Sequence, residues 1–112
     1  MSKKIVLSGA ITGHLEEAKE YFAEAKRAVF ERWPNAQVFD PTTIPSTVSW
    51  DDAMTICKTR IRGWATDIVC IKNDHYSLSE GSAIECDEAK KASLLVHTYE
   101  HGRLIEAKEI PG

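Results

Sequence analysis

The sequence lacks the features of a membrane, exported or nucleic-acid-gripping protein. Its longest apolar runs are of the size of "IVL" and "SLLV", whereas a bilayer-spanning helix needs roughly 20 residues. The start, "MSKKIVLSGA", has too short an apolar stretch for a secretory signal. The formal net charge is -3 and no block of Lys and Arg is present, so phosphates of a polymer are not the expected target. We expect a cytoplasmic protein that binds a small molecule or a protein partner, with no nucleic-acid polymer and no membrane.

Cysteine is also scarce. The three residues Cys57, Cys70 and Cys86 are odd in number and contain no close pair, which indicates neither a disulfide framework nor a zinc knuckle. We expect them to be reduced and mostly buried. His97 and His101 lie near a predicted turn, so a shared metal is not expected. No metal and no cofactor is predicted.

Length limits the number of domains. A chain of 112 residues, 43% hydrophobic and 28% charged, is large enough for one core but too small for a separate substrate domain. Neither the G-x-G-x-x-G fingerprint nor a P-loop motif occurs in it. One domain, residues 1–112, with one site is expected.

The hydrophobic pattern predicts strands alternating with amphipathic helices. The predicted strands cover residues 4–8, 36–40, 67–72, 93–99 and 103–110, and the last two could form a hairpin. The predicted helices cover residues 15–33, 50–63 and about 82–92. This order predicts an α/β, small Rossmann-like (flavodoxin-like) single domain. Its mostly parallel sheet should have four or five strands, with helices on both faces.

Parallel sheets bind ligands at the carboxyl ends of their strands. Three predicted loops should converge there, and they cover residues 9–14, 40–49 and 73–82. The first contains "SGAITG", whose glycines and helix N-terminus suit an anion, although a tight turn alone also requires glycine. The third leads into "SEGSAIE", residues 79–85.

Glu85 has two explanations. Ser82 and Glu85 have the spacing of a capping box, in which Ser82 or Ser79 caps the third helix and the glutamate satisfies its first turn. Alternatively, Glu85 faces a ligand near a helix N-terminus that favours its ionised form, and acts as nucleophile or base. The spacing does not separate these explanations.

Further polar and aromatic residues are weaker candidates. Asp67 opens a strand and could be a capping residue. Asp74 and Glu80 lie in the third loop, and a second carboxylate is what glycosidic chemistry requires beside the first. The tryptophans are interpreted as packing residues in preference to base-stacking platforms; they are Trp33, Trp50 and Trp64.

Taken in order, the motifs resemble the nucleoside 2-deoxyribosyltransferase superfamily. These motifs are "SGAITG", "DP" after the second strand, a tryptophan followed by a methionine, "DIV" in the third strand, and S-x-G-[SA]-x-x-E. They span about residues 4–96. The likeness is to a small uncharacterised branch common in bacteriophage genomes and to the nucleoside-monophosphate N-glycosidases.

The resemblance implies a retaining attack on the N-glycosidic bond of a deoxynucleoside or its monophosphate. Glu85 stands at the position of the nucleophile, which forms a glycosyl-enzyme that water or another base resolves. Ser79 stands six residues earlier, where the glycosidases have a serine that contacts the 5′-phosphate and the transferases have an aspartate. A nucleotide hydrolase is therefore expected, with a deoxyribosyltransferase or a non-catalytic nucleotide-binding module as alternatives.

The site residues that we predict form two groups. The catalytic group is Glu85, Asp67, Asp74 and Glu80. The substrate-binding group is Ser8, Gly9, Ala10, Ile11, Thr12, Gly13, Asp40, Ser79, Gly81 and Ser82.

Three positions depart from the pattern of the superfamily. Thr59 replaces an aspartate of the second helix, Val6 replaces a tyrosine of the first strand, and Thr12 replaces an arginine of the phosphate loop. Acid assistance would then have to come from Asp74 or Glu80. The family's sites are completed by a neighbouring subunit, and so short a chain has little surface to enclose a ligand, so we expect a homodimer or a dimer-based tetramer.

Overall fold

The structure is a computed structural model of the whole chain. It describes residues 2–9, 15–45, 47–72, 80–100 and 102–107, and of residues 15 and 80–83 it describes the backbone alone. Within these ranges strands and helices alternate as predicted: β1 (Lys4–Ser8), α1 (Leu15–Arg32), β2 (Gln37–Phe39), a short 3-10 helix η1 (Pro41–Thr43), α2 (Trp50–Gly63), β3 (Asp67–Ile71), α3 (Glu80–Lys91), β4 (Leu95–Glu100) and β5 (Arg103–Ile105).

The strands form one sheet in the order β2-β1-β3-β4-β5. The first four are parallel, and β5 pairs antiparallel with β4. Gly102, between these last two strands, has a φ of 71°, which glycine adopts at little cost and which suits a tight hairpin. The predicted α/β fold, with its mostly parallel sheet and final hairpin, is confirmed.

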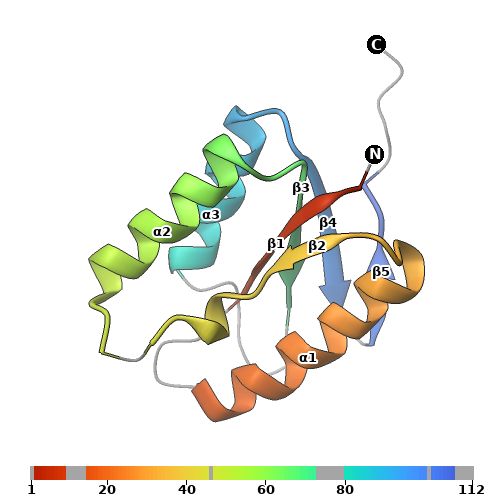
Figure 1. Cartoon of the computed structure of the whole chain (residues 1–112), viewed down its shortest axis with the longest axis horizontal. Helices are drawn as coiled ribbons and strands as arrows, with labels where there is room; N and C mark the ends of the chain where they lie inside the picture. The colour runs from red at the N-terminus through yellow and green to blue at the C-terminus, as the bar shows by residue number, and fades with distance from the viewer. Residues whose placement is uncertain (1, 10–14, 46, 73–79, 101, 108–112) are drawn as a thin grey trace.

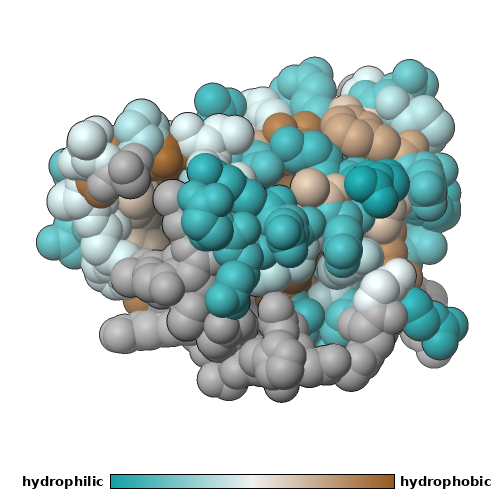
Figure 2. Space-filling model, turned by 90° about the horizontal axis from the view of Figure 1, so that it is seen from below, coloured by the Kyte–Doolittle hydropathy of each residue, from teal (hydrophilic) through white to brown (hydrophobic). Residues whose placement is uncertain are grey.

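Helices cover both faces of the sheet (Figure 1). Successive side chains of a strand point to opposite faces, so Ile5 and Leu7 of β1 pack with Phe22 of α1, whereas Val6 packs with Ile61 of α2 on the other side. β1 and β3 are therefore buried on both faces, which explains their unbroken apolar runs. The side seen in Figure 2, from below the view of Figure 1, is mainly hydrophilic, with smaller apolar areas.

The order of the connections shows at which end of the parallel strands a ligand is expected to bind. From β1 the chain passes through α1 to β2 on one side, then returns through α2 to β3 on the other. Ligands bind such sheets where the strand order reverses, outside the carboxyl ends of the strands. We call this the carboxyl edge; the opposite edge is the amino edge. The carboxyl ends of β1 and β3 are thus the place to look for a site.

Local signals explain where two elements begin. Ser49 caps α2, because its side chain accepts the N–H of Asp52, and the helix begins at Trp50 as predicted. Asp40 precedes Pro41 and is extended, with φ -107° and ψ 106°, and it caps η1. α3 begins at Glu80, two residues before the predicted start near Ser82.

The expectation that every cysteine is reduced is also wrong. Cys70 on β3 and Cys86 on α3 are joined by a disulfide, across a sequence separation of 16 residues. Cys57 on α2 is free and buried, as expected. The pair was not evident from spacing because β3 and α3 meet only when the helix packs on the sheet.

None of the described helices combines the length and the apolar character needed to cross a membrane.

Candidate functional site

Glu85 lies on the inner side of α3, against the sheet. Its side chain is only 7% exposed, and α3 contacts β1, β3 and α2. A capping box would place Ser82 before the helix and Glu85 at its third position. Because α3 begins at Glu80, Ser82 lies within the helix and Glu85 is in its second turn. The capping explanation of this glutamate is therefore excluded.

Two polar atoms at this position have no hydrogen-bond partner among the described residues: Ser8 Oγ and Glu85 Oε2. Ser8 is the last residue of β1 and is fully buried. Its hydroxyl faces the glutamate and acts to lower the pKa of the carboxyl, but the pair does not reach the geometry of an ordinary hydrogen bond. Buried polar groups are nearly always paired, so these two atoms mark a place where a ligand could supply the missing partners.

Burial controls the protonation of this carboxyl. It raises the pKa of Glu85 to about 7, against the opposing influence of Ser8 and of the Cys57 thiol. Burial also raises the pKa of Cys57 to about 12, aided by the charge of Glu85 and by a hydrogen bond to it. At neutral pH the Cys57 thiol therefore stays protonated, whereas both protonation states of the Glu85 carboxyl are populated.

The raised pKa predicts a pH-dependent stability. The folded pKa lies above the ordinary 4.5, so the stability that a neutral Glu85 provides is complete below about pH 4.5 and is lost as the pH rises through about 7. The shift corresponds to about 3 kcal/mol of unfolding free energy. Urea unfolding at a series of pH values should show this loss in the wild type but not in Glu85→Gln.

Asp87→Asn is the matched control, because Asp87 is an exposed acid of the same helix. It should keep the wild-type pH dependence. An equal loss of stability in the wild type and in Glu85→Gln would show that Glu85 is not the group that titrates.

Gly9, directly after Ser8, has a packing role. A Cβ at this position would lie 2.8 Å from Cε1 of Phe22 and 3.3 Å from Cβ of Ile71. Glycine is thus required where β1 passes close to α1, whatever it contributes to a ligand.

Asp40, at the carboxyl end of β2, already has partners. Its Oδ1 accepts the N–H of Thr42 at 2.9 Å and the hydroxyl of Thr42 at 2.6 Å. Its Oδ2 lies 3.0 Å from Nζ of Lys26. These contacts give Asp40 a local structural role at the carboxyl edge, and substrate binding would compete with them.

Asp67 lies at the other edge of the sheet. In the register of β1 and β3, Asp67 pairs with Ile5, whereas Ser8 pairs with Cys70. At roughly 3.3 Å per residue, three residues separate Asp67 from the position of Ser8 by about 10 Å. The structure therefore does not bring Asp67 together with Glu85.

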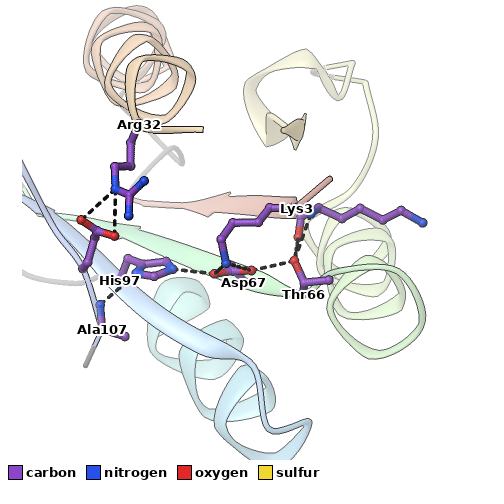
Figure 3. Close-up of polar contacts among 8 residues, drawn as sticks. Lys3, Arg32, Thr66, Asp67, His97 and Ala107 are labelled. Atoms are coloured by element: carbon purple, nitrogen blue, oxygen red, sulfur yellow. Dashed lines mark hydrogen bonds and ion pairs between the residues drawn. The ribbon is translucent and has the colours of Figure 1, made fainter. Parts of the chain in front are cut away.

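Asp67 is instead the centre of a buried polar network at the amino edge (Figure 3). Its Oδ2 lies 2.6 Å from His97 Nε2 and 3.0 Å from Lys3 Nζ, and its Oδ1 accepts the hydroxyl of Thr66 at 2.6 Å. His97 Nδ1 accepts the N–H of Ala107 at 2.9 Å, so Nε2 carries the proton that is donated to Asp67. The network joins both ends of the described chain to the sheet.

The same contacts set the charge of Asp67. Its burial alone would raise the pKa, but hydrogen bonds from His97, Thr66 and Lys3 outweigh burial and lower the pKa to about 2. The carboxyl is ionised at neutral pH and all its partners are in place, which is the chemistry of a structural ion pair.

Several predicted site residues lie outside this description. Asp74 and Ser79 fall outside the described residues, and so do the loop residues Ala10, Ile11, Thr12 and Gly13. Glu80, Gly81 and Ser82 form the start of α3, with the backbone alone described. Among the described residues no group of three His, Cys, Asp or Glu side chains could hold a metal ion.

Sequence reasoning missed Cys57, which it treated as an ordinary buried cysteine. A signal was available, because Trp50, Met54, Cys57 and Ile61 recur at spacings of four, three and four on α2. That spacing defines one helix face, and α3 is the helix that α2 contacts. The spacing on α2 does not predict that Glu85 of α3 is the neighbour of Cys57.

The model of a protein family described as a domain of unknown function (DUF4406) matches residues 3–98. The chain belongs to this family. The matched part of this DUF4406 domain includes Ser8, Cys57 and Glu85 and ends before β5. No curated protein matches the chain.

Proposed function

We propose that this DUF4406 domain hydrolyses the N-glycosidic bond of a (deoxy)nucleoside 5′-monophosphate and releases free base and sugar phosphate. The observation that carries the proposal is the buried Glu85 carboxyl at the carboxyl edge, whose Oε2 has no partner among the described residues. The resemblance of "SEGSAIE" and "SGAITG" to the nucleoside 2-deoxyribosyltransferase superfamily supplies the reaction class. We also propose that the protein is cytoplasmic, forms a homodimer or a dimer-based tetramer, and requires no cofactor.

In this reaction the ionised Glu85 attacks the anomeric carbon, the C–N bond breaks, and the base leaves with a proton from an acid. Water then cleaves the glycosyl ester, so that nucleotide and water yield base and sugar phosphate. The protonated Cys57 thiol acts on the pKa of Glu85, so it lies beside the carboxyl during the attack. A pKa of about 7 leaves a substantial ionised fraction at neutral pH.

The acid must come from a residue other than Asp67. Asp67 is ionised and lies at the amino edge among Lys3, Thr66 and His97, so it has neither the proton nor the position. Asp74 and Glu80 remain the candidates in the proposed mechanism.

The decisive experiment is release of free base from a panel of deoxynucleoside and ribonucleoside monophosphates, followed by chromatography. We expect base and sugar phosphate in equal amounts, and faster release from monophosphates than from nucleosides. Addition of a second free base tests the transferase alternative, because a transferase would form a new nucleotide. Nucleotide binding without release of base from any member of the panel would leave the non-catalytic binding module as the function.

Ser79 is the proposed contact of the 5′-phosphate. It directly precedes α3 in the sequence, and a helix N-terminus favours an anion. Ser79→Ala should lower kcat/KM for monophosphates by about ten- to a hundredfold, since a hydrogen bond to a charged group contributes roughly 1.5–3 kcal/mol. The nucleoside is the internal control, and an equal loss on both substrates would remove the phosphate role.

A further inference from the structure

The side chains on one face of α2 become more exposed to solvent toward the N-terminus of the helix. Ile61 is 1% exposed, Cys57 3% and Met54 8%, whereas Trp50 is 47% exposed. These residues share a face because a helix has 3.6 residues per turn. α2 follows the carboxyl end of β2 and leads to the amino end of β3, so the exposed end of this face lies at the carboxyl edge.

The buried part of this face lies beside Glu85, the proposed nucleophile. Cys57 and Glu85 influence each other's pKa, and Trp50 lies seven residues before Cys57 on the same helix, about 10 Å along its axis at 1.5 Å per residue. Met54 lies between them. A nucleobase extends several ångströms from the anomeric carbon that Glu85 would attack, so a base that lies along this face of α2 would contact Met54 and Trp50.

Trp50 also differs from the other tryptophans in its packing. Trp33 and Trp64 pack against the two core clusters, which confirms them as packing residues, but Trp50 belongs to neither cluster among the described residues. A half-exposed indole on an otherwise buried face leaves a large aromatic surface without a partner from these clusters. Such a surface stacks well on a flat aromatic ring.

The charges beside Trp50 determine which end of a nucleotide can lie there. Asp51 and Asp52 are exposed in the first turn of α2, and two carboxylates disfavour a phosphate nearby. The base end of a nucleotide carries no such charge.

We propose that Trp50 is the specificity-determining residue of the site and that its indole stacks on the base of the bound nucleotide, with Met54 completing the wall toward Glu85. This inference rests on the proposed function, because it takes the ligand to be a nucleotide. A purine covers more of the indole than a pyrimidine does, so purine nucleotides bind more tightly.

Tryptophan fluorescence and calorimetry test this inference without turnover. The probes are deoxyguanosine monophosphate, thymidine monophosphate and 2-deoxyribose 5-phosphate, which has no base. Both nucleotides should quench the wild type and Trp64→Phe, but not Trp50→Phe. Trp50→Ala should weaken nucleotide binding by about ten- to a hundredfold and leave binding of the base-free sugar phosphate unchanged. Trp50→Phe, which keeps an aromatic ring, should retain most of the affinity.

Three results would overturn the inference: quenching that persists in Trp50→Phe, equal weakening of all probes in Trp50→Ala, or no Trp50-dependent quenching by either nucleotide at millimolar concentration. Base release is measured separately on the same proteins. Trp50-dependent binding without release of base refutes the glycosidase and leaves the stacking role. Release with an unchanged KM in Trp50→Ala refutes the stacking role and leaves the glycosidase.

Discussion

Replacement of Glu85 by glutamine should reduce release of base by about a thousandfold or more, because the amide keeps the shape of the side chain but cannot form the glycosyl ester. The fold should be retained. Glu85 is in the second turn of α3 and caps nothing, and a neutral amide removes the cost of a buried charge above pH 7. Initial rates on the best monophosphate of the panel, together with far-UV circular dichroism, measure both effects.

Asp87→Asn provides the comparison for this loss. Asp87 is exposed on the same helix and lies 3.4 Å from Nζ of Lys91, a surface pair of small energy. It should have wild-type activity. If Glu85→Gln releases base at the wild-type rate, Glu85 is not the nucleophile and the proposed mechanism fails.

The beginnings of α2 and α3 show how far local sequence signals reach. At α2, a single serine, Ser49, precedes two acidic residues, and the structure begins the helix where the sequence predicted. At α3, Ser79 and Ser82 both offer a cap three residues apart, and only the folded helix decides between them. A shift from residue 82 to residue 80 changes Glu85 from a plausible capping residue into a buried carboxyl of the second turn.

Partners that are distant in sequence could not be predicted. Asp67 and His97 are 30 residues apart, on neighbouring strands whose register the sequence does not define. Asp67 was included in the predicted catalytic group, although the predicted strand 67–72 already placed this residue at the amino end of its strand. Likewise, the burial that raises the pKa of Glu85 depends on the packing of α3 against β1 and α2, which no single segment encodes.

Removal of the Asp67 carboxylate should produce the largest loss of stability from any polar residue described. Asp67→Ala leaves Lys3 and the Nε2–H of His97 without their acceptor. Because His97 is nearly as buried as Asp67, water cannot readily replace that acceptor. Breaking a buried pair on one side costs about 3–5 kcal/mol. Asp67→Asn should cost less, because it keeps an acceptor oxygen. Urea unfolding at pH 7 measures both, with the exposed Asp52→Ala as control.

Unfolding at low pH tests the contribution of Asp67 independently. The pKa of Asp67 is lowered from the ordinary 3.8 to about 2 in the folded state. The stability from its ionised form is therefore complete above about pH 4 and is lost as the pH falls through about 2. Asp67→Asn should lack this part of the acid transition. An identical acid transition in the wild type and in Asp67→Asn would mean that the network does not stabilise the fold.

Measurements of activity distinguish the role of Asp67 at the amino edge from that of Glu85 at the carboxyl edge. The folded fraction of Asp67→Asn should release base with an unchanged kcat and KM, because Asp67 lies at the amino edge and Glu85 lies against the carboxyl end of β1. Assays below the unfolding temperature of the variant, corrected for the folded fraction, measure this. A large fall in kcat with normal folding would restore Asp67 to the predicted catalytic group. It would also mean that the network around His97 acts on the reaction through the length of β3.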